Sequence, residues 1–100
     1  MAYPLLFLAG MLLCNAIPHL ASGMRGERFF TPWARPRGSG RSSAVENFLW
    51  GSANLLAAIF VLIDVWPQKT PHGLIVLGAG FLLIGVGLSW AFGKRVDRGF

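Results

Sequence analysis

The chain has 100 residues, of which 54% are hydrophobic and 13% are charged, with one cysteine and a formal net charge of +5. A single cysteine excludes an internal disulfide, and the hydrophobic fraction alone does not separate a soluble from a membrane protein. The charge pattern indicates a membrane protein, because the charged residues leave three uncharged runs at 1–24, 47–63 and 70–93. About 20 apolar residues span a hydrocarbon core of about 30 Å. We therefore expect an all-α membrane protein with three transmembrane helices, forming one membrane domain over residues 1–100.

The first expected span covers residues 3–24. Pro18 lacks a backbone donor and predicts a kink or an early helix end near residues 16–20. Residues 1–4 carry no basic side chain and residues 19–22 offer no convincing signal-peptidase site, so we expect this segment to stay in the mature protein. Cys14 is expected to be a small buried apolar residue.

Residues 25–43 form an arginine-rich linker that suits no regular helix because of its prolines and glycines. Phe29, Phe30 and Trp33 lie among the arginines, a mixture typical of the headgroup layer, where rings rest on acyl chains and guanidinium groups meet phosphates. Positive-inside bias explains this charge without nucleic acid, which we do not expect as a partner. We expect contact with anionic lipid from five side chains, Arg25, Arg28, Arg35, Arg37 and Arg41.

The second and third spans are expected at residues 44–64 and 72–92, joined by a short hairpin at 65–71 and followed by a basic tail at 93–100. Ser43, with Glu46 three residues later, predicts a capping box at the start of the second span. Thr70 and Pro71 predict the N-cap and first residue of the third.

The linker and the tail fall on one side of the membrane and carry eight of the nine Lys and Arg residues. The positive-inside rule therefore places the N-terminus and hairpin outside, and the linker and C-terminus in the cytoplasm.

Intramembrane polar residues occupy two helix faces. Asn15 and His19 are four apart in the first span, and a second stripe contains Asn47, Gly51, Asn54 and Ala58. Asn15 and Asn54 are each about 15 Å from the cytoplasmic edge at helical rise, which makes them candidates to bond each other. Such a pair acts either as an interhelical clasp or as part of a substrate or ion site.

His19 and Glu46 lie at similar depths and are feasible partners in a proton relay. In the alternative interpretation, Glu46 caps its own helix and His19 caps backbone opened by Pro18. His72 is expected on the opposite face, so one chain supplies no two-histidine haem site. Since no metal-ligand spacing and no catalytic constellation is present either, we expect no cofactor, no metal and no enzyme activity.

Glycines of the third span form two stripes on roughly opposite faces, Gly78 with Gly85 and Gly80 with Gly87, and Ser89 extends the first. Small residues allow close helix contact. We expect one side to face this chain's own helices and the other to face a partner.

Residues 15–51 contain Asn15-x-x-Pro18-His19, Gly26-x-x-Phe29-x-Thr31-Pro32, Gly38-x-Gly40-x-Ser42-Ser43 and Asn47-x-x-Trp50-Gly51. This pattern resembles small bacterial inner-membrane proteins without a named activity, which implies the bacterial plasma membrane as location and supplies no catalytic residue.

We expect a multi-pass inner-membrane protein that acts as an accessory or assembly subunit of a larger membrane protein, or as a self-associating structural module. The alternative is a minimal homo-oligomeric transporter or channel, with a path lined by the five polar residues Asn15, His19, Glu46, Asn47 and Asn54.

Overall fold

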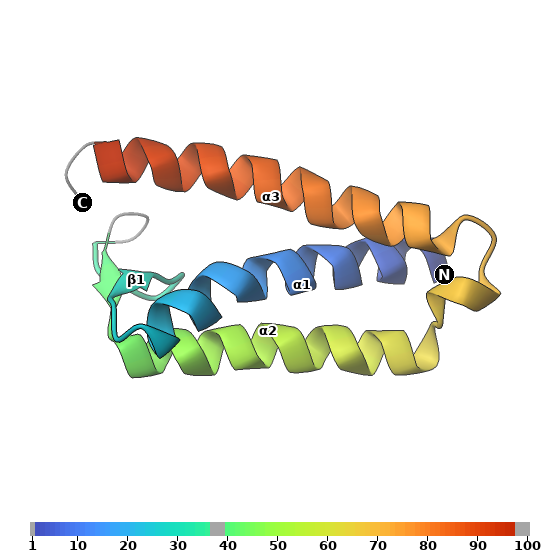
Figure 1. Cartoon of the computed structure of the whole chain (residues 1–100), viewed down its shortest axis with the longest axis horizontal. Coiled ribbons are helices and arrows are strands. Elements are labelled where there is room, and N and C mark those ends of the chain that lie inside the picture. The colour runs from blue at the N-terminus through green and yellow to red at the C-terminus, as the bar shows by residue number, and fades with distance from the viewer. Residues whose placement is uncertain (1, 37–39, 98–100) are drawn as a thin grey trace.

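The computed structural model describes residues 2–36 and 40–97, with side chains up to residue 94. The elements in chain order are α1 (Ala2–Met24), β1 (Phe29–Phe30), β2 (Arg41–Ser42), α2 (Ala44–Asp64), the 3-10 helix η1 (Pro67–Lys69) and α3 (Gly73–Asp97). The three α-helices are each long and apolar enough to span a membrane, which confirms that part of the sequence prediction (Figure 1).

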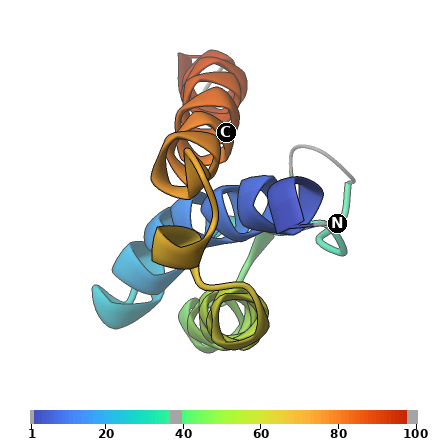
Figure 2. The ribbon, with the colours of Figure 1, turned by 90° about the vertical axis from the view of Figure 1, so that its right-hand side faces the viewer.

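Helix α1 lies in the middle of the molecule, with α2 and α3 on either side of it (Figures 1 and 2). Both outer helices pack along α1, while within the described residues they make little contact with each other. The buried residues of α2 are Asn47, Gly51, Asn54 and Ala58, which is the stripe predicted from the sequence. Helix α3 is the most exposed, with 6% of its apolar window buried.

Glycines set the spacing of the helices. A methyl group at Gly51 would lie 2.8 Å from the backbone nitrogen of Leu20, so α2 approaches α1 closely at this position. At the other interface, Gly10 of α1 meets the backbone of Leu77, and Gly80 of α3 meets the carbonyl of Phe7. Any side chain larger than hydrogen at these glycines would separate the helices.

Helix α1 continues without interruption through Pro18 to Met24, so of the two outcomes predicted at Pro18, a kink or an early helix end, the early end is wrong. The proline removes one backbone donor, but the rest of the helix is retained. The predicted capping box of α2 is confirmed: the Ser43 hydroxyl accepts from the Glu46 backbone N–H at 3.1 Å, and the Glu46 carboxylate accepts from the Ser43 N–H at 3.0 Å.

The start and end of α3 differ from the prediction. Thr70 and Pro71 precede the helix, which begins at Gly73 after His72 adopts a left-handed φ of 59°. The Tyr3 hydroxyl donates to the Pro71 carbonyl at 2.9 Å and joins the start of α1 to this turn. At the other end α3 continues to Asp97, because charged residues end an apolar span without ending a helix.

The linker folds back onto the helices instead of lying open. Strands β1 and β2 pair antiparallel, with Phe29 opposite Ser42 and Phe30 opposite Arg41. The Thr31 and Ser42 hydroxyls are hydrogen bonded to each other. The expectation that Phe29 and Phe30 rest on acyl chains is therefore wrong, since Phe30 is only 4% exposed and both rings pack inward.

Candidate functional site

An asparagine pair joins α1 and α2 near their centres. Asn15 Nδ2 donates to Asn54 Oδ1 at 3.1 Å, and Asn54 Nδ2 donates to the Trp50 carbonyl one turn earlier at 2.9 Å. This second bond fixes the orientation of the Asn54 amide, because only nitrogen can donate to a carbonyl. The two residues proposed from their depth as mutual partners thus lie in direct contact.

A second polar contact lies nearer the linker. The Asn47 side chain is fully buried, and its Nδ2 lies within hydrogen-bond distance of three carbonyls, those of Phe29 at 3.2 Å, Ser42 at 3.2 Å and Ser43 at 3.0 Å. His19 Nδ1 lies 2.8 Å from Asn47 Oδ1. The three carbonyls require the amide nitrogen on their side, so the oxygen faces the imidazole and His19 Nδ1 must donate to it. One side chain therefore joins α1, both linker strands and the start of α2.

Glu46, which depth alone made a feasible partner of His19, is not hydrogen bonded to it. Its carboxylate caps its own helix and accepts from Trp33 Nε1 at 3.1 Å. The reason is helical geometry: Asn47 occupies the buried stripe, and the preceding residue is rotated by about 100° toward the exterior. The alternative interpretation is correct for Glu46 but not for His19, whose side chain bonds Asn47.

Aromatic rings of the linker pack against His19 of α1, Trp50 of α2 and Phe92 of α3. Phe29 packs edge-on against His19, with ring centroids 5.5 Å apart, and Phe30 stacks on Phe92 of α3 at 5.2 Å. Trp33 packs edge-on against Trp50 at 5.3 Å. Because α3 contributes Phe92, the linker contacts all three helices at this end of the molecule. In the sequence, the only signal of Phe92 is its position at the predicted cytoplasmic end of the third span.

A pocket of about 240 Å³ remains between these groups. Polar and aromatic side chains contribute to its lining, together with a small residue of α3: Asn15, His19, Phe30, Trp50, Ala91 and Phe92. The described residues include no group of three or more acidic, histidine or cysteine side chains able to hold a metal ion. The pocket can therefore offer hydrogen bonds and ring contacts, but no charged ligand set.

The predicted glycine stripes of α3 lie partly against α1 and partly outside. Gly80 contacts Phe7, and a methyl group at Gly85 would lie 3.0 Å from the Cys14 sulfur, whereas Gly78 and Gly87 face open space. Ser89 is exposed beside Gly85. Each stripe thus has one glycine near α1 and one outside, instead of one stripe facing inward and the other outward.

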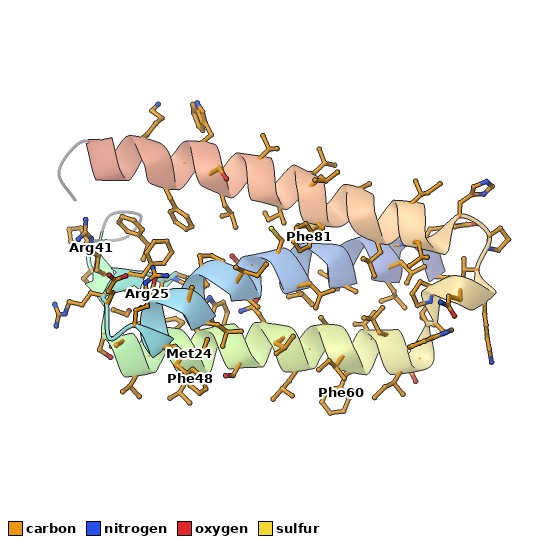
Figure 3. The ribbon with its side chains drawn as sticks, in the orientation of Figure 1. Met24, Arg25, Arg41, Phe48, Phe60 and Phe81 are labelled. Atoms are coloured by element: carbon orange, nitrogen blue, oxygen red, sulfur yellow. The ribbon has the colours of Figure 1, made fainter. Side chains whose placement is uncertain are left out.

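The described arginines of the linker are exposed at one end of the molecule, where Figure 3 shows Arg25 and Arg41. Arg25 forms an ion pair with Glu27 at 2.9 Å, and the guanidinium of Arg41 lies 5.3 Å from the Phe30 ring centroid. Arg28 and Arg35 are exposed as well, and Arg37 lies outside the described residues. This end of the molecule is therefore basic.

Comparison of the chain with family models, with curated proteins and with solved structures gave no match.

Proposed function

We propose that this chain is a multi-pass protein of the bacterial plasma membrane that serves as a structural subunit, either accessory to a larger membrane protein or self-associating. The main support for this proposal is that the polar side chains of the helices bond to each other. Asn15, His19, Asn47 and Asn54 are engaged between α1 and α2, so they hold helices together, while the outer side of α3 remains uncovered.

Lipid as the surrounding solvent is supported by the outward apolar side chains. Phe60 is 71% exposed and projects from α2 away from α1, whereas Phe81 lies between α3 and α1 (Figure 3). In water, apolar exposure along the full length of two helices would favour aggregation, whereas in a bilayer it is the ordinary state. The proposed orientation has the linker and the end of α3 in the cytoplasm, supported by their position at one end of the molecule (Figure 1).

Cysteine accessibility tests this orientation. In a Cys14→Ala background, Arg35→Cys and Lys94→Cys should be blocked by a membrane-impermeant maleimide only in inverted vesicles, and Gln68→Cys only in intact spheroplasts. Labelling of Arg35→Cys and Lys94→Cys from opposite sides would refute the topology.

The contact surface of α3 is tested by crosslinking in native membranes. Gly78→Cys in the Cys14→Ala background places a thiol where the structure leaves open space, and Phe60→Cys on the outer side of α2 is the matched control. A crosslinked product at twice the chain mass supports self-association, and a larger discrete product supports an accessory role. Equal crosslinking from both positions, or none from Gly78→Cys, would contradict the proposal.

The rival function, a minimal homo-oligomeric transporter or channel, is favoured by one observation, the pocket beside Asn15 and His19. Solute flux through reconstituted liposomes that disappears in Asn15→Leu, with the oligomer preserved, would replace the structural proposal.

A further inference from the structure

The pocket presents an unused basic nitrogen. His19 is 2% exposed and its Nδ1 is bonded to Asn47, while no hydrogen bond joins its Nε2 to any described residue. No described side-chain nitrogen or oxygen is both sealed from solvent and without a partner, so Nε2 is not sealed. Since His19 lines the pocket, this nitrogen opens into it.

The hydrogen-bonding character of this nitrogen is fixed by Asn47. Because Nδ1 carries the proton donated to Asn47 Oδ1, the neutral imidazole bears a lone pair at Nε2 and can only accept. Asn15 adds a second acceptor: its Nδ2 is directed to Asn54, which leaves its Oδ1 available beside the pocket. A ligand matched to these two atoms must bring hydrogen-bond donors.

The walls and size restrict the ligand further. Phe30, Phe92 and Trp50 supply aromatic surface from the linker, α3 and α2, and no carboxylate lines the pocket. A cavity of about 150 Å³ accommodates benzene, so one of about 240 Å³ has room for a substituted six-membered ring but not for a macrocycle. A metal cation without an acidic ligand and a haem group therefore both fit poorly.

We propose that this pocket is a binding site for a membrane-soluble aromatic molecule of the hydroquinone class, with one ring hydroxyl donating to His19 Nε2. The aromatic walls hold the ring, and Asn15 Oδ1 is placed to accept from a polar substituent. The site binds the molecule, and no electron transfer is part of the proposal. It goes beyond the structural function proposed above, because it depends on this pocket and not on the outer side of α3.

The test is ¹⁵N NMR of histidine-labelled chain in lipid nanodiscs under argon, with tetramethylhydroquinone as probe. The chain has two histidines, so the exposed His72 serves as an internal control for non-specific partitioning. Before addition, His19 should show a protonated Nδ1 and an unprotonated Nε2. The probe should shift the Nε2 resonance saturably while the His72 signals stay in place.

Tetramethyl-1,4-benzoquinone is the matched control ligand, since it has the same ring and methyl groups but only acceptor oxygens. We expect it to bind at least about tenfold more weakly, because it cannot pair with the lone pair of Nε2. Equal binding of the two forms, equal shifts at both histidines, or a proton on Nε2 before addition would overturn the proposal, and none of these outcomes depends on a variant.

A pocket variant gives independent support. Ala91→Leu fills the space from α3 and should weaken binding of the hydroquinone at least about tenfold, whereas Val86→Leu on the exposed side of α3 should leave it unchanged. An unaltered Nδ1 signal in Ala91→Leu shows that the contact with Asn47 persists. Unchanged affinity in that variant would mean that the probe binds elsewhere.

Discussion

Replacement of Asn47 by leucine should destabilise the protein more than the same replacement of any other polar residue between α1 and α2. The side chain is fully buried, and leucine is similar in size but can neither donate to the carbonyls of Phe29 and Ser42 nor accept from His19. The Ser43 carbonyl is less affected, because it still accepts from the Asn47 backbone N–H at 3.0 Å.

The size of the effect follows from the groups left without partners. A buried polar group that loses its partner costs about 1 to 3 kcal/mol. Three groups are affected, but two of them are carbonyls of the linker, which can regain part of the loss from water at this end of the molecule. We therefore expect a total of roughly 3 kcal/mol, or about a 100-fold change in the unfolding equilibrium.

Asn54→Leu is the matched control. It loses the hydrogen bond that Asn54 Oδ1 accepts from Asn15, and the Trp50 carbonyl, to which Asn54 Nδ2 donates, belongs to its own helix. Hydrogen bonds between membrane helices average about 0.6 kcal/mol, so this variant should lose several times less stability than Asn47→Leu. Unfolding in mixed micelles with increasing SDS, followed by tryptophan fluorescence, measures both. Equal destabilisation of the two variants would refute the role assigned to Asn47.

Three further substitutions, two of them with a matched control, test the packing and the linker. Gly51→Ala should destabilise by at least about 1 kcal/mol, because the added methyl group meets the backbone of α1, whereas Gly87→Ala should not, because it faces open space; the same SDS titration compares them. Ser43→Ala removes the capping box and should cost about 1 kcal/mol in that assay, and no loss would mean that the first turn of α2 is held by other contacts. Phe92→Ala removes the ring on which the linker packs and should accelerate trypsin cleavage at the linker arginines, measured by mass spectrometry, while Trp90→Ala on the exposed side leaves the rate unchanged.

The features predicted from the sequence are those with a local physical cause. The capping box at Ser43 depends on a spacing of three residues, and the buried stripe of α2 depends on helical period. The closeness of Asn15 and Asn54 follows from their equal distance from the charged ends of the two predicted spans, which is fixed by helical rise.

The features missed depend on contacts distant in the chain. The two strands of the linker have two residues each, which is too short for an alternating pattern in the sequence. The Phe29 and Phe30 rings of β1 are turned inward by packing on His19 and Phe92. The central position of α1 was not predictable either, because three apolar spans of similar length can be arranged in several ways. The start of α3 was misplaced because the left-handed His72 has no distinct sequence signal.

Folding of the linker and the chemistry of the pocket are coupled through one amide. Asn47 can hold the proton of His19 on Nδ1 only while its own nitrogen faces the carbonyls of Phe29 and Ser42, which belong to the two linker strands. Opening of the linker would release the amide and allow the imidazole to change tautomer, so Nε2 would no longer be fixed as an acceptor. A donor ligand bound at Nε2 must therefore stabilise the folded linker, because a ligand that prefers one conformation shifts the population toward it. Tetramethylhydroquinone should accordingly slow trypsin cleavage at the linker arginines, whereas tetramethyl-1,4-benzoquinone should not. Equal protection by both ligands would show that the Asn47 amide does not couple folding of the linker to the tautomer of His19.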